Sequence, residues 1–239
     1  MTWHDVFHDT FKALREQTGA DTQRQVDFML PSWPMIEACR ANELDSFLPF
    51  IAAGKLTADQ MHHACQRYCL GKTKTGTPIF WMIDDILYPL DAHIGDTWMS
   101  KLLKQREPIL DCWKVQHCLF GLHVLGIEEG RHTISIVESE ASAVVLSELF
   151  PESIWMAYAT PSHLVPDLFA PLEGQTVTIY PRTDPTLSTY LFFRDLVNLT
   201  LETYDLDLSV DTTLDDHATD AQKDQSIDLV DSLISNLNS

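Results

Sequence analysis

The chain has 239 residues, of which 45% are hydrophobic, and its 16 Lys and Arg stand against 35 Asp and Glu for a formal net charge of −19. This length can bury one large core or two small ones, which excludes a many-domain assembly. No uninterrupted apolar run reaches the roughly 18 residues of a membrane span, and the charge disfavours non-specific nucleic-acid binding, which depends on neutralising phosphates.

The N-terminus and the cysteines indicate the compartment. The first 16 residues place acids and bases among apolar residues, unlike a secretory signal. Five cysteines are an odd number, which favours reduced thiols over a disulfide framework. We therefore expect a cytoplasmic protein without membrane contact. Any nucleic acid would have to bind through a local site, because basic residues are sparse.

The first part of the chain predicts a helical region over residues 1–55. Apolar residues recur at helical spacing over 3–18 and again over 35–53. Glycines close each of these stretches, as is common just beyond the end of a helix.

Residues 56–131 predict a smaller, mixed α+β subdomain. Thr57 and Gln60 form a capping box that begins a helix reaching about residue 68. The apolar run 78–83 predicts a buried strand, and residues 86–88 a hairpin partner. The remaining elements expected in this region are a helix near 98–104 and a strand-like stretch over 112–116.

From residue 132 the pattern changes to alternating strands and helices. Strands are predicted at 133–137, 154–157 and 177–180, and helices at 139–150, 162–169 and 185–203. This alternation is typical of a parallel sheet covered by helices. We therefore predict an α/β domain over residues 132–204.

Residues 205–239 differ from the rest in composition. They contain nine aspartates and a single lysine, Lys223. Such a composition predicts a solvated and partly disordered tail. Apolar residues at helical spacing near its end, over 227–237, predict a helix that docks on this domain or on a partner. The charge of the tail would suit a basic protein partner.

Polar side chains follow each predicted strand of the α/β domain, namely Glu138 and Glu140 after the first, Thr160 and Ser162 after the second, and Arg182 and Asp184 after the third. Ligands of open parallel sheets bind at the carboxyl ends of the strands. Glu138 and Asp184 could converge there on Mg²⁺, which takes one or two carboxylates together with water and phosphate oxygens. Alternatively, the acids serve as caps at helix N-termini.

Several short motifs occur in the order in which a known family carries them. Residues 136–139, Ile-Val-Glu-Ser, resemble the acidic strand end of toprim domains. Residues 177–184 stand where those domains carry a strand ending in Asp-x-Asp, and the turn 159–162 takes the place of their Gly-Thr turn. Upstream, residues 68–84 and 116–123 resemble the core of bacterial replicative primases and a group of uncharacterised toprim-like proteins associated with mobile elements.

The resemblance covers about residues 40–200. It implies a toprim-like parallel sheet and Mg²⁺-dependent nucleotidyl transfer or strand cleavage. Glu138 and Asp184 match the catalytic, metal-binding positions, and Glu140 is a further candidate ligand.

Two departures from the family bear on the predicted ligand site. Arg182 stands in place of one metal-binding aspartate, and Ala159 in place of the turn glycine. A guanidinium is permanently cationic, so Arg182 would repel a divalent ion and could pair with Glu138 or Asp184. Arg182, together with Thr160 and Ser162, is then predicted to bind a phosphate or a substrate.

Three functional hypotheses remain open. The departures and the charge favour a degenerate toprim-like, primase-like protein of nucleic-acid metabolism, with a part in DNA replication and little or no metal-dependent catalysis. The retained acids favour an active Mg²⁺-dependent nucleotidyl transferase or nuclease. The acidic tail favours a protein-binding module.

Three other constellations are weaker. The zinc-ligand types in residues 62–69, the pair of Cys118 and His123, and the aromatic pair of Phe80 and Trp81 suggest a zinc site, a thiol nucleophile and a base-stacking surface, respectively. Ordinary helix packing and core burial account for the same residues.

Overall fold

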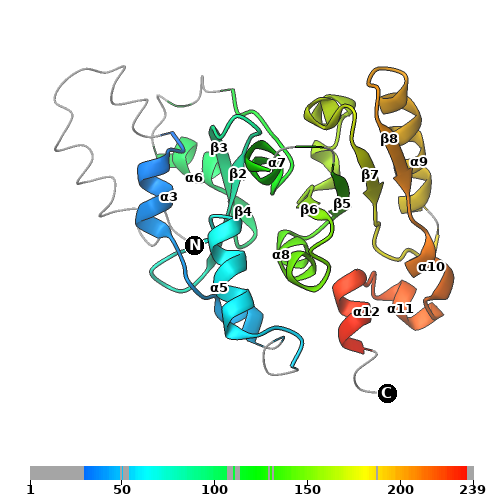
Figure 1. Ribbon diagram of the computed structural model, residues 1–239, viewed down its shortest axis with the longest axis horizontal. Coiled ribbons are helices and arrows are strands. Elements are labelled where there is room, and N and C mark those ends of the chain that lie inside the picture. The colour runs from blue at the N-terminus through cyan, green and yellow to red at the C-terminus, as the bar shows by residue number, and fades with distance from the viewer. Residues whose placement is uncertain are drawn as a thin grey trace. The chain divides into compact units, whose positions relative to one another are not determined.

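The computed structural model describes residues 30–48, 50, 54–106, 110, 114–128, 130, 132–186 and 188–235, so the predicted helix over 3–18 lies outside the described residues. The chain divides into two compact units, Met1–Cys118 and Leu119–Ser239, whose elements Figure 1 labels. The first contains an antiparallel sheet and the second a parallel sheet with helices beside it, so the predicted α/β class is confirmed. In the described part of the chain, no helix has the length and apolar character needed to cross a membrane.

The first unit is built around a four-stranded antiparallel sheet in the order β1-β2-β3-β4. Trp81, Ile83 and Ile94 from this sheet pack in a core with Leu103. The elements of the unit are α3 (Trp33–Cys39), η1 (Asp45–Phe47), α5 (Ala58–Arg67), β1 (Gly71–Lys72), β2 (Pro78–Ile83), β3 (Pro89–Ile94), β4 (Thr97–Trp98) and α6 (Met99–Arg106).

In this unit, predictions from neighbouring residues are confirmed where no distant segment pairs with the same backbone. The capping box is confirmed, since the Gln60 backbone N–H donates to Thr57 Oγ1 (3.1 Å) and the Thr57 N–H donates to Gln60 Oε1 (3.0 Å). The continuous helix expected over 35–53 is wrong, because α3 ends at Cys39. The next residues pair with the segment before β1 instead, and the Ala41 N–H donates to the Leu70 carbonyl at 2.8 Å.

The predicted hairpin partner of β2 is shifted along the chain. Residues 86–88 form the turn, and the paired strand β3 begins at Pro89. Asp84 holds this turn, since its Oδ1 accepts hydrogen bonds from the backbone N–H groups of Ile86 (3.1 Å) and Tyr88 (2.7 Å). An aspartate that accepts from backbone two residues ahead is a common turn device, and here it outweighs the β propensity of the apolar residues.

The second unit contains a four-stranded parallel sheet in the order β6-β5-β7-β8. The elements are α7 (Leu122–Ile127), β5 (Thr133–Val137), α8 (Glu140–Leu149), β6 (Ile154–Ala157), η3 (Pro161–His163), η4 (Pro166–Leu172), β7 (Thr176–Ile179), α9 (Ser188–Leu201), β8 (Asp207–Val210), α10 (Thr213–His217), α11 (Asp220–Asp224) and α12 (Leu229–Ser235). Helix α8 packs against β5 and β6, and helix α9 packs against β8 and η4.

Residues 119–131, expected to belong to the upstream subdomain, fall in the second unit. Phe120 forms an isolated antiparallel bridge with Ala157 of β6, and its N–H donates to the Ala157 carbonyl at 2.8 Å. The boundary predicted between residues 131 and 132 therefore lies about one short helix, α7, downstream of the boundary in the structure.

The expectation of a solvated, partly disordered tail is corrected by β8. This strand pairs in parallel with β7, in a register that joins Thr176 to Asp207 and Ile179 to Val210. Leu206 and Leu208 alternate with the aspartates and are buried, and each buried aliphatic side chain stabilises a fold by about 1.5–3 kcal/mol. The high aspartate content concealed a strand in which buried leucines alternate with polar residues. The backbone groups of this strand form hydrogen bonds with the neighbouring strand β7.

Candidate functional site

The strand order of the second unit reverses between β5 and β7, which leaves a crevice at their carboxyl ends. Crevices at such a switch point are the usual ligand sites of open parallel sheets. A cavity of about 540 Å³ opens there, lined by Glu138, Tyr158, Pro161, Arg182, Thr183, Asp184, Ser188, Thr189, Phe192, Phe193 and Ser226.

An ion pair joins two strand ends in this cavity. The Nε of Arg182, beyond β7, lies 3.1 Å from Oε2 of Glu138, which directly follows β5, and about a third of each side chain is exposed. The Tyr158 hydroxyl, at the end of β6, donates to the same carboxylate oxygen at 3.3 Å. Burial and the neighbouring Glu138 carboxylate raise the pKa of Tyr158 far above its usual range, so this hydroxyl remains a donor at all physiological pH values.

The turn after β6 positions Tyr158. Ala159 adopts a left-handed conformation with φ +57°, which costs a non-glycine residue about 1–2 kcal/mol. Its N–H donates to the Glu138 carbonyl at 3.0 Å, and the Tyr158 N–H donates to the Val137 carbonyl at 3.2 Å. These two hydrogen bonds tie the end of β6 to the end of β5.

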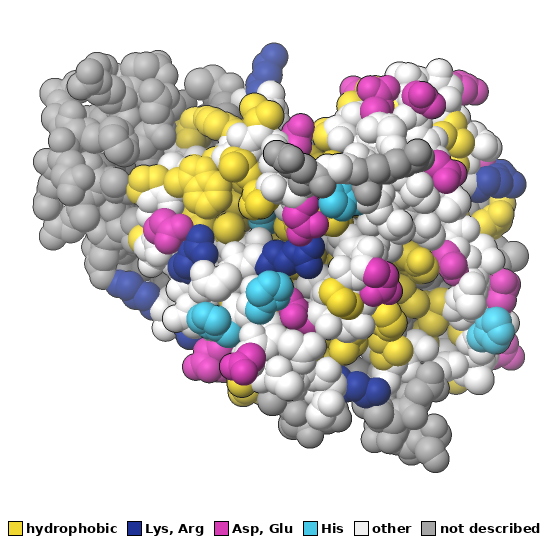
Figure 2. Space-filling view, viewed as in Figure 1, with side chains coloured by type: hydrophobic (Ala, Val, Ile, Leu, Met, Phe, Trp, Pro, Cys, Tyr) yellow, Lys and Arg dark blue, Asp and Glu magenta, His cyan; other side chains and the backbone are white. Residues whose placement is uncertain are grey.

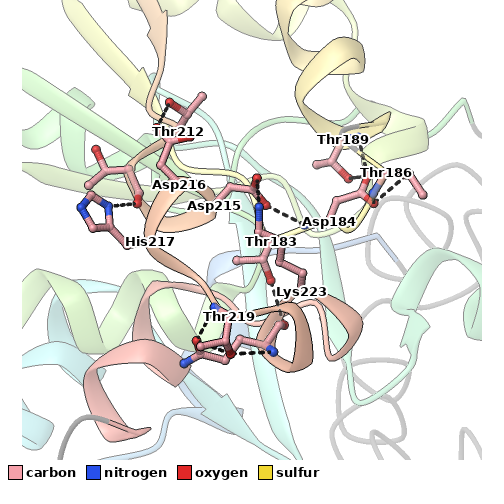
Figure 3. Close-up of polar contacts among 12 residues, drawn as sticks. Thr183, Asp184, Thr186, Thr189, Thr212, Asp215, Asp216, His217, Thr219 and Lys223 are labelled. Atoms are coloured by element: carbon pink, nitrogen blue, oxygen red, sulfur yellow. Dashed lines mark hydrogen bonds and ion pairs between the residues drawn. The ribbon is translucent and has the colours of Figure 1, made fainter.

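Asp184 caps helix α9, as Figure 3 shows. Its Oδ1 accepts from the N–H and hydroxyl of Thr186 at 2.8 and 2.7 Å, and its Oδ2 accepts from the Ser188 hydroxyl (2.5 Å) and from the N–H and hydroxyl of Thr189 (2.8 and 3.1 Å). These hydrogen bonds, that from Ser188 foremost, hold the pKa of Asp184 well below its usual range. The helix-capping alternative therefore describes Asp184.

A second network connects the end of β7 to the C-terminal segment (Figure 3). The Asp184 N–H donates to Asp215 Oδ1 at 3.0 Å, and Lys223 Nζ lies 2.8 Å from Asp215 Oδ2. Thr183, which is 1% exposed, donates from its N–H to the Ile227 carbonyl (3.0 Å) and from its hydroxyl to the Gln222 carbonyl (3.1 Å).

The residues implied as Mg²⁺ ligands do not fit that ion in this arrangement. Glu138 is paired with a fixed cation, and both oxygens of Asp184 accept hydrogen bonds that cap a helix. Glu140 is the buried first residue of α8 and is not part of the cavity lining. Among the described residues, no three His, Cys, Asp or Glu side chains form a group that could hold a metal.

The predicted phosphate-binding turn lies only partly at the cavity. Pro161 belongs to the lining, whereas Thr160 and Ser162 on either side of it do not. The helix predicted over 162–169 is replaced by two 3₁₀ segments, Pro161–His163 and Pro166–Leu172. Pro166, in the middle of the predicted helix, interrupts the α-helical hydrogen-bond pattern because it lacks a backbone N–H, and it begins the second 3₁₀ segment instead.

Burial and packing account for the candidate zinc site, thiol nucleophile and base-stacking surface. Cys65 and Cys69 are buried, whereas His62 and His63 are exposed on the same helix or near it, and burial raises the pKa of the Cys65 thiol to about 11. Burial also raises the pKa of Cys118 far above its usual value, which opposes a role as nucleophile. Trp81 is 0% exposed in the core of the first unit, so its face cannot stack a base there.

Sequence reasoning missed several residues of the cavity. Tyr158 directly follows β6, so the strand-end argument that found Glu138 could have found it as well. Ser188 and Thr189 were hidden inside a predicted helix whose true start is Ser188. Ser226 reaches the cavity from a segment 44 residues beyond Arg182, and no local signal indicates this contact.

Comparison with known proteins finds a family model that matches part of the chain. Residues 90–183 match a domain described as a domain of unknown function, DUF6371. No curated protein and no solved structure matches the chain. The matched residues run from β3 to the end of β7 and include Glu138, Tyr158 and Arg182, so the chain is similar to this domain over the part that holds the ion pair.

Proposed function

We propose that this protein is a degenerate toprim-like, primase-like protein of nucleic-acid metabolism, whose second unit binds a ligand with a phosphoryl group and has little or no metal-dependent catalysis. The Arg182–Glu138 ion pair carries the proposal. The motifs that resemble toprim domains assign these two positions to a metal site, and the two side chains meet at the cavity between β5 and β7.

The ion pair favours binding over metal chemistry on electrostatic grounds. A divalent cation at Glu138 would lie next to a guanidinium that never loses its charge. Binding such a cation would also require Glu138 to give up a 3.1 Å contact that is partly shielded from water. A phosphoryl group, in contrast, is the ligand that the planar N–H donors of an arginine match best.

The negative charge of the surface limits the length of nucleic acid that could bind. Acidic side chains are spread over the face of the second unit that Figure 2 draws, and basic ones are sparse there. With a net charge of −19, the protein should repel a long polyanion. A nucleotide or the end of a nucleic-acid strand suits the local Arg182 site better than a duplex.

One observation supports an active Mg²⁺-dependent nucleotidyl transferase or nuclease as the second candidate. Glu138 and Asp184, the two acids that match the family's metal ligands, line the same cavity. That function would require Arg182 to leave Glu138 and Asp184 to leave the N-terminus of α9.

Calorimetric titration of Mg²⁺ and Mn²⁺ separates the two functions. We expect no binding to the parent at millimolar metal, and we expect Arg182→Asp to create binding, because it exchanges the fixed cation for a third carboxylate at the cavity. The control is Glu152→Gln, an exposed acid of the same unit. Metal binding by the parent that disappears in Glu138→Gln would establish the second candidate, and an Arg182→Asp variant without metal affinity would contradict the idea that the guanidinium replaces the ion.

A further inference from the structure

The C-terminal segment from Thr219 to Ser235, here called the strap, packs against the carboxyl ends of the sheet. Each of its two short helices begins with a reciprocal cap, formed by Thr219 with Gln222 and by Asp228 with Asp231. Figure 1 draws its last helix, α12, beside α8. Between the helices, Ser226 turns the chain in a left-handed conformation, with φ +50°.

The strap covers the hydrogen-bond donors at the end of β7. Arg182 Nη1 donates to the Ser226 carbonyl at 3.3 Å, and the Thr183 N–H donates to the Ile227 carbonyl at 3.0 Å. The Thr183 hydroxyl donates to the Gln222 carbonyl at 3.1 Å. All three acceptors are main-chain oxygens, and phosphoryl oxygens accept hydrogen bonds from the same kinds of donor.

The two helices of the strap, of five and seven residues, depend on packing against the rest of the unit, because helices this short are not stable in isolation. Its attachment depends on a few contacts. Ile227 and Val230 are 7% and 4% exposed, and Asp228 Oδ2 accepts from the Ser142 hydroxyl of α8 at 2.5 Å. Segments held by few buried apolar contacts are the ones that open locally while the rest of a domain stays folded.

The negative charge of the strap would also repel a phosphoryl group, the ligand whose place at these donors its carbonyls take. Four aspartates stand in it against one lysine, Lys223, and Lys223 is neutralised by Asp215. A phosphoryl group that approaches Arg182 therefore meets an Nη1 that already donates to Ser226, two occupied donors of Thr183 and a negative segment.

We propose that the strap is an intramolecular inhibitor, which occupies in cis the donors of Arg182 and Thr183 that bind the phosphoryl group of the ligand. This inference rests on the proposed function, which places that ligand in the cavity. Phosphoryl binding is then limited by the fraction of molecules in which the strap is open, since the apparent affinity falls in proportion to that fraction. A partner that holds the strap would switch binding on.

Substitution at Ser226 tests the proposal in the full-length chain. Proline cannot adopt a positive φ, so Ser226→Pro breaks the turn of the strap at an exposed residue, outside the core of the unit. Glycine adopts this conformation readily, so Ser226→Gly is the matched control that keeps the strap closed. Hydrogen exchange over residues 219–235 reports opening, and calorimetry with pyrophosphate reports binding.

We expect Ser226→Pro to bind pyrophosphate at least about tenfold more tightly than the parent and Ser226→Gly, since the strap is then open in no more than about one parent molecule in ten. Adding Arg182→Ala to Ser226→Pro should remove the gain. Ile227→Asn, which removes a buried anchor of the strap, is a second opening variant with the same expectation. Opening without tighter pyrophosphate binding, or a gain that survives Arg182→Ala, would overturn the proposal.

Mg²⁺ titration of the opened variant keeps the two proposals apart. Metal binding that requires Glu138 would overturn the proposed function while leaving inhibition by the strap intact. Pyrophosphate affinity that is unchanged in an opened variant without metal binding would overturn inhibition by the strap alone.

Discussion

In the first unit, polar side chains of the sheet serve the sheet and its connections, whereas in the second unit they gather at one edge. Asp91 lies in the middle of β3 and accepts from the N–H groups of Ala92 (2.8 Å) and Ser100 (2.9 Å), where it holds the start of α6. Glu138, Tyr158 and Arg182 come from the ends of three parallel strands and meet at one cavity.

The difference follows from strand direction. In an antiparallel sheet, neighbouring strands end at opposite edges, so residues that follow the strands go into separate turns. In a parallel sheet, all carboxyl ends share an edge, and the reversal of strand order opens a crevice there. Strand direction thus determines where a functional site can form, whichever residues follow the strands.

The largest expected effect comes from removing the edge of the second sheet. Deleting residues 205–239 removes β8 and the buried Leu206, Leu208, Ile227 and Val230. At about 1.5–3 kcal/mol for each buried aliphatic side chain, the loss approaches the stability of a whole domain, about 5–15 kcal/mol. We expect the second unit to lose its cooperative thermal transition by circular dichroism. A truncated chain that melts like the parent would show that these residues are not part of the fold.

A smaller effect is expected at the site itself. Asp184→Ala removes the cap of α9, so we expect a loss of about 0.5–2 kcal/mol in the free energy of unfolding at pH 7. The folded state holds the pKa of Asp184 well below its usual value. The carboxylate therefore makes its full contribution to the free energy of unfolding above about pH 4, and this contribution is lost as the pH falls further. Urea titrations from pH 7 down to pH 3 should show parent and variant converging. A constant difference would mean that the charge of Asp184 is irrelevant.

The smallest effect, with the opposite sign, is expected in the first unit. Burial raises the pKa of Asp91, and its Oδ2 has no hydrogen-bond partner among the described residues. The folded state therefore binds a proton more readily than the unfolded state, and Asp91 lowers stability as the pH rises through its folded pKa.

Asp91→Asn should accordingly raise the free energy of unfolding at pH 7. The gain should stay under about 1 kcal/mol, because an unpaired buried amide donor itself costs about 1–3 kcal/mol. Urea titrations at pH 7 and pH 4 measure it, with the exposed Asp96→Asn as control. Destabilisation at pH 7 that persists at pH 4 would place the cost in packing rather than in charge.

Features that depend on neighbouring residues could be predicted from the sequence. The Thr57 capping box, the strands over 133–137 and 154–157, and the alternation that predicts a parallel sheet all appear in the structure. Their signals lie within a few residues of one another, so no distant segment is needed to read them. The strand-end argument also found Glu138 and Arg182, because parallel strands bring their ends together whatever lies between them.

The roles of those residues depend on contacts with distant parts of the chain. Asp184 caps a helix because α9 begins at Ser188, within hydrogen-bond reach of its carboxylate, and Arg182 pairs with Glu138. The acidic C-terminal residues became a strand and a strap because β7 offers an open edge and Thr183 offers donors to carbonyls 39 to 44 residues away. Composition reports the average of a segment, whereas pairing with a distant strand depends on the few apolar residues that alternate within it.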